Sequence, residues 1–173
     1  FRRVLFRSLR AFAARTKAAF PESDADFPGS GAAGGMGFAL RTFLGASLVP
    51  GIEIVMQETG LEEKIRAADV VVTGEGRLDA QTAMGKAPAG VARLAKRHGK
   101  LVLAFAGGIA DGAEACNAAG IDAFFPAVRG VTTLEAAMEP ATAAKNLASS
   151  AEQAFRLLAA AGAARGEVAE SRV

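Results

Sequence analysis

Residues 69–90 read DVVVTGEGRLDAQTAMGKAPAG, and this stretch decides the fold. The mainly apolar run 70–73 predicts a strand buried on both faces, and Pro88 opens a predicted helix after a polar loop. Two further compact apolar runs, at residues 101–106 and 123–125, predict two more buried strands. Strands that alternate with helices imply right-handed crossovers, so the sequence predicts an α/β fold with a parallel sheet flanked by helices.

The apolar periodicity, together with residues typical of helix ends, predicts the helices around these strands. The predicted helices span residues 9–19, 34–44, 52–58, 61–67, 88–97, 111–119 and 142–160. The last of them is amphipathic, with one apolar stripe formed by Leu147, Ala151, Ala154, Phe155 and Leu158. Three strands are few for a doubly wound sheet, because its edges and faces need covering.

The loop predicted after the first strand gathers side chains that can carry chemistry. Its charged residues are Glu75, Arg77, Asp79 and Lys86, and its hydroxyl and glycine residues are Thr73, Thr82, Gly74, Gly76 and Gly85. In open α/β sheets ligands bind at the carboxyl ends of the strands, so this composition predicts a site for a small polar anion. The alternative is a solvated loop in which the arginine and the aspartate pair with each other.

A second candidate site is the glycine cluster made of Gly29, Ser30, Gly31, Gly34 and Gly35. It matches the G-x-G-x-x-G pattern of dinucleotide sites, but that pattern has meaning only between a strand and a helix. The preceding residues PESDADFP carry acids and two prolines and cannot form a buried strand, which argues against a nicotinamide site. Two interpretations remain: a backbone that approaches an anion beside a helix start near Gly34, or a tight domain-crossover turn.

A phosphate-binding P-loop is excluded at Gly85-Lys86. The G-x-x-x-x-G-K-[ST] pattern needs a glycine where the chain has Ala80, and a hydroxyl for magnesium where it has Ala87. A phosphate at this loop would therefore be bound by a different arrangement.

Composition narrows the class of protein. The chain has 173 residues, which fits one domain, and its 20 basic and 18 acidic residues give no argument for nucleic-acid binding. No apolar run approaches the ~20 residues of a membrane span. The single cysteine, Cys116, excludes an internal disulfide and fits a reducing cytoplasm. The single histidine, His98, precedes Gly99 at a predicted helix end, where a cation and a glycine cap are ordinary.

Both ends of the chain differ from its middle. Residues 1–20 hold six basic residues and no acidic one, which fits an amphipathic helix, an Arg-rich transit peptide or sequence foreign to the protein. We expect foreign or truncated sequence at residues 1–8, followed by a helix. Residues 162–173 are polar and aperiodic and are predicted to form a flexible tail.

The segment TGEGRLDAQTAMGKAPAGVA resembles the hallmark segment of the bacterial glycerate kinase family, the type that forms 2-phosphoglycerate. The upstream segment PGSGAAGGMGFAL and the downstream segment LVLAFAGG resemble other parts of that family. The resemblance runs from about Asp26 to about Leu158 in unbroken order. It covers only the C-terminal part of the family's enzymes, and it offers no counterpart for residues 1–8.

The resemblance implies a two-domain enzyme. One domain would be flavodoxin-like and completed by N-terminal strands that this chain lacks, and a second α/β domain would be inserted between its halves. We therefore expect four parts: an N-terminal helix at residues 1–25, the Gly-rich end of the second domain and crossover at 26–50, the C-terminal part of the flavodoxin-like domain at 51–161, and the tail at 162–173.

The resemblance also implies the reaction, in which ATP and D-glycerate give 2-phosphoglycerate and ADP. Phosphoryl transfer asks for Mg²⁺, for positive charge around the γ-phosphoryl and for a group near the attacking hydroxyl. Arg77 and Lys86 are expected to supply the charge, and Asp79 to activate the hydroxyl. Glu75 is the second choice as base, and Glu75 or Asp79 would hold magnesium. The glycine cluster would line a phosphate or the substrate carboxylate.

We expect a cytoplasmic protein that acts on small molecules, binds neither nucleic acid nor membrane, and forms a homodimer if it associates. The isolated 173-residue chain is expected to be inactive, because domain closure around both substrates would need the absent part. The alternative function is a non-catalytic α/β domain that binds small anions. A dinucleotide-dependent oxidoreductase is the third possibility.

Overall fold

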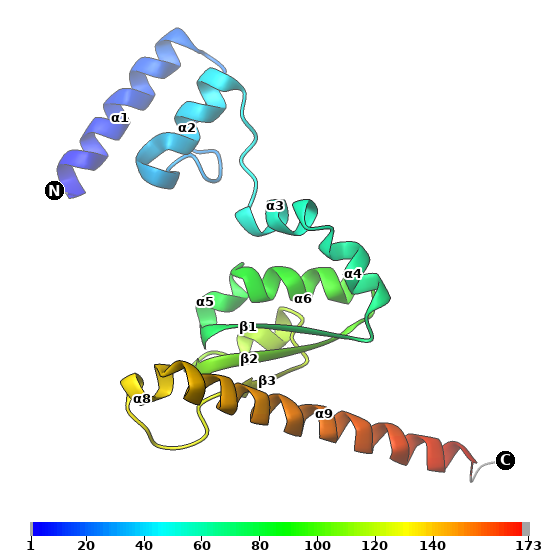
Figure 1. The fold of residues 1–173 in the computed structure, drawn as a ribbon. Helices are drawn as coiled ribbons and strands as arrows, with labels where there is room; N and C mark the ends of the chain where they lie inside the picture. Colours follow the sequence, from blue (N-terminus) through cyan, green and yellow to red (C-terminus); the bar gives the residue numbers. More distant parts are fainter. Residues whose placement is uncertain (1, 171–173) are drawn as a thin grey trace. The chain divides into compact units, whose positions relative to one another are not determined.

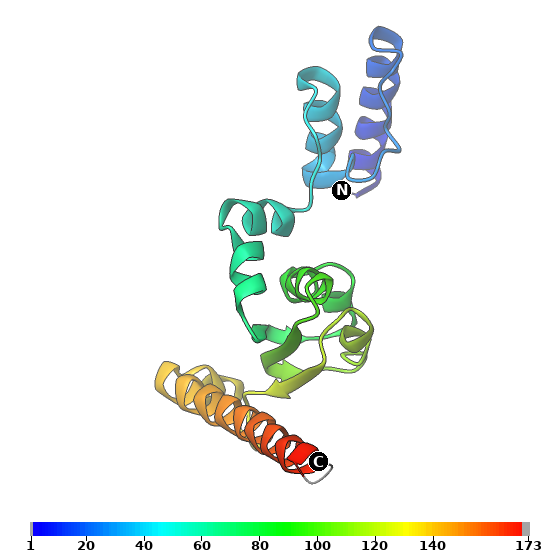
Figure 2. The same ribbon diagram turned by 90° about the vertical axis from the view of Figure 1, so that its right-hand side faces the viewer.

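The computed structural model describes residues 2–170, and the chain divides into two compact units, residues 1–51 and 52–173. The first unit is helical, and the second is an α/β unit that contains the sheet (Figures 1 and 2). The finer division into four parts stays a prediction.

Two helices, α1 (Arg2–Ala19) and α2 (Ala32–Leu44), form most of the first unit. The ring of Phe12 meets that of Phe38 edge-on, with centroids 5.6 Å apart. Such a pair contributes about 0.5–1.5 kcal/mol beyond its buried area. α1 begins at Arg2 rather than at residue 9, so the N-terminal segment is part of the helix. Whether residues 1–8 are native stays a prediction.

The glycine cluster forms a left-handed turn at the start of α2. Ala33, Gly34 and Gly35 have φ angles of 50°, 70° and 93°, so the regular helix begins after Gly35 rather than near Gly34. This conformation suits glycine and costs Ala33 about 1–2 kcal/mol. A Cβ on Gly37 would lie 2.3 Å from the carbonyl oxygen of Gly29, so the backbone touches itself across the turn. The geometry is that of a tight turn, and anion binding there stays a prediction.

Three parallel strands, in the order β1-β2-β3, form the sheet in the described residues. They are β1 (Val70–Leu78), β2 (Leu101–Ile109) and β3 (Ala123–Pro126). β1 and β2 are in register from Val70 opposite Leu101 to Leu78 opposite Ile109. The predicted α/β fold with a parallel sheet is confirmed.

Helices cover both faces of this sheet (Figure 1). The covering elements are α4 (Leu61–Ala67) and α6 (Ala87–Arg97) on one face and α9 (Pro140–Glu170) on the other. Val102 and Ala104 of β2 face the core shared with α6, whereas Leu103 and Phe105 face α9. β2 is therefore buried on both faces, as its continuous apolar run predicts.

The apolar stripe of α9 is narrower than predicted. Ala151, Ala154 and Leu158 pack on the sheet, but Leu147 and Phe155 are 44% and 43% exposed. The reason is that α9 contacts β2 and β3, and only the residues along the centre of the stripe reach those strands.

The remaining helices are α3 (Gly51–Glu58), α5 (Ala80–Ala83), α7 (Ala115–Ala118) and α8 (Leu134–Met138), and all of them except α3 differ from the prediction. α3 agrees with its predicted span, whereas α5 and α8 are too short to show a period and were not predicted. The helix predicted over 111–119 is wrong apart from α7, because Gly112 has φ 80° and interrupts helical backbone. α9 continues to Glu170, and residues 171–173 lie outside the described residues, so the flexible tail stays a prediction.

β1 is also longer than predicted, and this difference matters for the site. The strand continues to Leu78 instead of ending at residue 73, so the expectation that Glu75 and Arg77 lie in a loop is wrong. Both residues stay in register with β2, opposite Ala106 and Gly108. Glycines and charged residues alternate over this part of β1, so a search for apolar runs does not detect the strand.

Two glycines of β1 should respond in opposite ways to substitution by alanine. A Cβ on Gly74 would lie 2.2 Å from the carbonyl oxygen of Phe105, whereas a Cβ on Gly76 would meet nothing within 4 Å. We expect Gly74→Ala to lower the free energy of unfolding by about 2 kcal/mol or more, since the two backbones must separate. Gly76→Ala, the matched control, should change it by less than about 0.5 kcal/mol. Urea unfolding followed by circular dichroism measures both, and equal effects would contradict the close approach.

Candidate functional site

The carboxyl end of β1 passes directly into α5 through a capping aspartate. Leu78 is completely buried, and its carbonyl oxygen accepts from the Ala110 N–H (2.9 Å), which fixes the end of the strand. Asp79 is then the N-cap of α5: its Oδ1 accepts from the Thr82 N–H at 3.0 Å, and Thr82 Oγ1 accepts from the Asp79 N–H at 3.2 Å. This reciprocal capping satisfies two backbone donors and holds both side chains in place.

Thr82 links two carboxylates. Its completely buried hydroxyl donates to Glu75 Oε1 and lies 3.3 Å from Asp79 Oδ1. The ammonium of Lys86 also reaches Asp79 Oδ1, at 3.2 Å. These four residues, Glu75, Asp79, Thr82 and Lys86, form one hydrogen-bonded group, called here the Asp79 cluster. It lies at the carboxyl edge of the sheet, where the sequence predicts a site.

The electrostatics of Asp79 favour its charged form. Burial acts to raise the pKa of the Asp79 carboxyl, but the hydrogen bonds from Lys86 and from the Thr82 N–H outweigh it, and the net pKa lies below its usual value. The side chains of Asp79 and Lys86 are still 30% and 39% exposed. The Asp79 carboxyl is therefore charged at neutral pH, and the pair is open to a ligand.

Removal of the lysine charge should raise the pKa of Asp79. In Lys86→Met, the carboxyl keeps its bonds to Thr82 but loses the ammonium, so its pKa should move up toward the ordinary aspartate value of about 3.9. A lowered pKa stabilises the folded chain above the unfolded pKa, and this stability is lost as pH falls through the folded pKa. The variant should thus begin acid unfolding at higher pH. An NMR titration of the carboxyl carbon measures the pKa, with Lys64→Met as the control, and an unchanged value would contradict the pairing.

Other predicted site residues of β1 take different positions. Arg77 is exposed and makes no ion pair within the described residues, so the aspartate pairs with Lys86 and not with the arginine. Packing explains the glycine at position 74, because a Cβ there would lie too close to the carbonyl oxygen of Phe105. Thr73 lies opposite Ala104, well inside the strand, and Gly85 has φ 123° in the turn between α5 and α6.

The structure adds residues that the sequence did not indicate. Cys116 of α7 is completely buried beneath the cluster, and its Sγ lies 3.8 Å from the Asp79 carbonyl oxygen. Burial raises the pKa of this thiol, and the negative charges of Glu75 and Asp79 add to the effect. On β2, a Cβ on Gly107 would lie 2.6 Å from the Gly76 carbonyl oxygen. Because these contacts join residues about 30 or more positions apart, no local sequence pattern reveals them.

The glycine cluster, residues 29–35, belongs to the first unit and not to the unit that holds the Asp79 cluster. Ser30 is buried, and its carbonyl oxygen accepts from the Phe38 N–H at 3.0 Å. That the two sets of residues serve one ligand stays a prediction.

A metal ion fits the cluster only in part. Within the residues that the structure describes, no three His, Cys, Asp or Glu side chains lie together as a metal-binding group. Glu75 and Asp79 are a pair, and each keeps one carboxylate oxygen without a hydrogen bond inside the described part of the chain. Mg²⁺ is often held by one or two carboxylates together with substrate phosphates, and two carboxylates suit that mode.

Open α/β sheets bind their ligands at the carboxyl ends of the strands, and in this chain that edge carries two carboxylates and a lysine. The comparisons with known proteins agree. The chain belongs to the glycerate kinase family, whose model matches residues 3–159. The match begins well before Asp26, so the expectation that nothing in the family corresponds to residues 3–8 is wrong.

Curated relatives are similar to about two thirds of this chain. The glycerate kinase of Halalkalibacterium halodurans is 50% identical over 115 residues, which is 66% of this chain and 30% of the relative. The glycerate 2-kinase of Escherichia coli K12 is 48% identical, over 67% of this chain and 30% of the relative. The crystal structure assigned as glycerate kinase 2 of Salmonella typhimurium LT2 is 38% identical with a TM-score of 0.64, over 88% of this chain and 39% of that one. The chain thus spans about a third of the length of the curated relatives it matches.

Among the described residues, even the 31-residue helix α9 is not apolar enough over its length to cross a membrane, and neither is any other helix.

Proposed function

We propose that the chain carries the phosphoryl-transfer site of a glycerate 2-kinase, in which ATP and D-glycerate give 2-phosphoglycerate and ADP. The observation that carries the proposal is the Asp79 cluster, a charged and partly exposed group at the carboxyl edge of the sheet, in a chain of the glycerate kinase family. The relative named glycerate 2-kinase supports the choice of the 2-hydroxyl as the acceptor.

Lys86 and Arg77 are the proposed phosphate contacts. The Lys86 ammonium has three donors, of which one reaches Asp79, and two are left for phosphoryl oxygens. Arg77 is exposed near the carboxyl end of β1 and presents a planar fork that suits a phosphate or the glycerate carboxylate. Positive charge at this place offsets the negative charge on the transferred phosphoryl group.

Asp79 is the proposed partner of the attacking hydroxyl. Its lowered pKa makes it a weak base, which would serve poorly for removing a proton before the reaction. In the loose transition state of phosphoryl transfer the hydroxyl need only be oriented and its proton accepted late, and a weak base suffices for that. Glu75, held by the Thr82 hydroxyl, is the second carboxylate.

Magnesium fits the proposal through the two carboxylates. Glu75 or Asp79 would hold the ion by the carboxylate oxygen that is not engaged with Thr82, and Mg²⁺ supplies charge neutralisation of the β- and γ-phosphates when bound. The glycine cluster at residues 29–35 would add backbone N–H groups for a phosphate or a carboxylate. We further propose that the enzyme is cytoplasmic, and a homodimer if it associates.

The experiment that tests the proposal is a chimaera. The matching segment of the H. halodurans enzyme, 50% identical, is replaced by residues 26–161 of this chain. The chimaera should phosphorylate D-glycerate with ATP, whereas the 173-residue chain alone should be inactive, because it spans about a third of its relatives. Coupling to enolase without phosphoglycerate mutase detects 2-phosphoglycerate directly.

Two outcomes would contradict the proposal. A chimaera that folds, as judged by cooperative thermal unfolding, but does not turn over would favour the non-catalytic anion-binding domain. A requirement for mutase in the coupled assay would place the phosphoryl group on the 3-hydroxyl and exclude the 2-kinase.

A further inference from the structure

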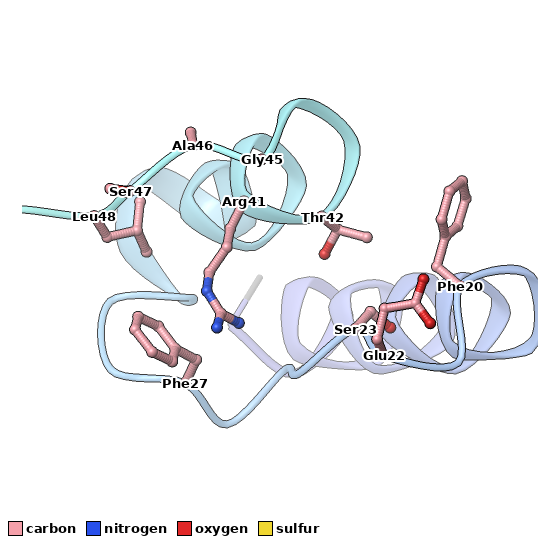
Figure 3. A pocket seen from close by; sticks show the side chains of 10 residues that line it. All are labelled: Phe20, Glu22, Ser23, Phe27, Arg41, Thr42, Gly45, Ala46, Ser47 and Leu48. Carbon is pink, nitrogen blue, oxygen red and sulfur yellow. The ribbon is translucent and has the colours of Figure 1, made fainter.

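The first unit contains a pocket of its own, with a volume of about 490 Å³ (Figure 3). This volume lies in the range of small-molecule sites, about 300–1,000 Å³. The pocket lies between the turn after α1 and the end of α2, and it mixes aromatic with polar side chains. The glycine cluster does not line it.

Arg41 is the cation of this pocket. Its guanidinium lies 3.7 Å from the centroid of the Phe27 ring, and Figure 3 shows it directed from α2 toward the opposite wall. It forms no ion pair with any carboxylate in the described part of the chain. The aromatic ring stabilises the guanidinium at this place, and the N–H groups of the guanidinium can donate to an anion.

Ser23 supplies an unused hydroxyl. The residue lines the pocket and is 7% exposed, and its Oγ has no hydrogen-bond partner among the described residues. Its backbone is already engaged: the N–H donates to the Phe20 carbonyl oxygen at 2.9 Å, and the carbonyl oxygen accepts from Lys17 Nζ at 2.8 Å. A buried hydroxyl without a partner destabilises a folded chain, so a residue kept in this state points to a ligand.

Glu22 restricts the kind of anion. Its carboxylate lies beside Ser23 in the same pocket and would repel a ligand that carries only negative groups. A ligand with a hydroxyl or another donor can satisfy Glu22 while its anionic group contacts Arg41. The chemistry required is thus an acid with a hydrogen-bond donor a short distance away.

We propose that this pocket binds a small hydroxylated organic anion, a carboxylate or a phosphate ester, with its anionic group on Arg41 and a hydroxyl facing Glu22 and Ser23. The inference is independent of the proposed kinase reaction, because it rests on residues of the first unit alone.

The test uses the 173-residue chain and three probes at constant ionic strength, followed by calorimetry and by ¹H–¹⁵N NMR shifts. Tartrate should bind and shift residues of the pocket, and succinate, which lacks the hydroxyls, should bind about tenfold more weakly. Glycerol 3-phosphate tells whether a phosphate ester replaces the carboxylate. Arg41→Gln should weaken tartrate binding by about tenfold or more, since a charge-assisted fork is lost. The matched control, Arg15→Gln on the exposed side of α1, should bind like the original chain.

Ser23→Ala separates a ligand-binding role from a structural one. Because the hydroxyl has no partner in the part of the chain that the structure describes, its removal should raise the Tm or leave it unchanged, while tartrate binding weakens. Glu22→Gln should remove the preference for tartrate over succinate. The proposal is overturned if none of the probes binds, if binding is insensitive to Arg41→Gln, or if Ser23→Ala lowers the Tm and leaves the affinity unchanged.

Discussion

Asp79→Asn in the chimaera should lower kcat by about 100-fold or more without loss of the fold. Asparagine keeps the shape of the side chain and is as good an N-cap as aspartate, so α5 and its bonds to Thr82 should remain. What disappears is the negative charge that we propose orients the glycerate hydroxyl. Steady-state kinetics and thermal unfolding on the same preparations measure both effects.

The control for this variant flanks the other end of the same strand. Asp69 is exposed just before the amino end of β1, whereas Asp79 follows its carboxyl end. Asp69→Asn removes the same charge away from the proposed site and should leave kcat unchanged. If Asp79→Asn also keeps the parental kcat, Asp79 is a helix cap and nothing more, and the chemistry lies elsewhere.

Lys86→Ala should have the second large effect, a fall in kcat/KM of about 100-fold or more. The removed ammonium would otherwise stabilise the charge that develops on the phosphoryl group, and one such contact in a preorganised site is worth about 10²–10³ in rate. The alternative role of Lys86, closing the loop through its pair with Asp79, predicts a different result. Exposed ion pairs contribute only ~0–1 kcal/mol to stability, so breaking one should barely change the rate.

Lys64→Ala, on an exposed position of α4, is the matched control for the lysine. It should leave kcat/KM unchanged. Circular dichroism should report an intact α6 in Lys86→Ala, because Pro88 and the backbone at the start of that helix are retained. Parental kinetics in the lysine variant would assign Lys86 to the structural pair.

The sequence predicted the sheet and the neighbourhood of the site because those depend on local signals. Apolar runs located all three strands, and the concentration of charges after Val72 located the carboxyl edge. The end of β1 was missed because pairing with β2, a contact between distant parts of the chain, keeps Glu75 and Arg77 extended. The polar pattern by itself is equally compatible with a loop.

Local sequence signals also do not identify the residue that forms the ion pair with Asp79. The segment after the first apolar run holds two cations, Arg77 and Lys86, and local spacing does not show which of them pairs with Asp79. The choice follows from α5: capping by Asp79 turns the chain so that the residue seven positions later returns to the carboxylate. Ser23 and Arg41 gave no signal at all, since a lone serine and a lone arginine on different segments acquire meaning only when the fold brings them to one pocket.

Cys116 provides a probe that the chain already carries. It is the only cysteine in the sequence, and it is completely buried below Asp79. A thiol reagent can modify Cys116 only when α7 separates from the loop above it. The rate of modification therefore reports how often this region opens locally. Ligands that stabilise the Asp79 cluster should lower the rate at which Cys116 is modified. This rate can therefore rank such ligands, and the protein needs no introduced label.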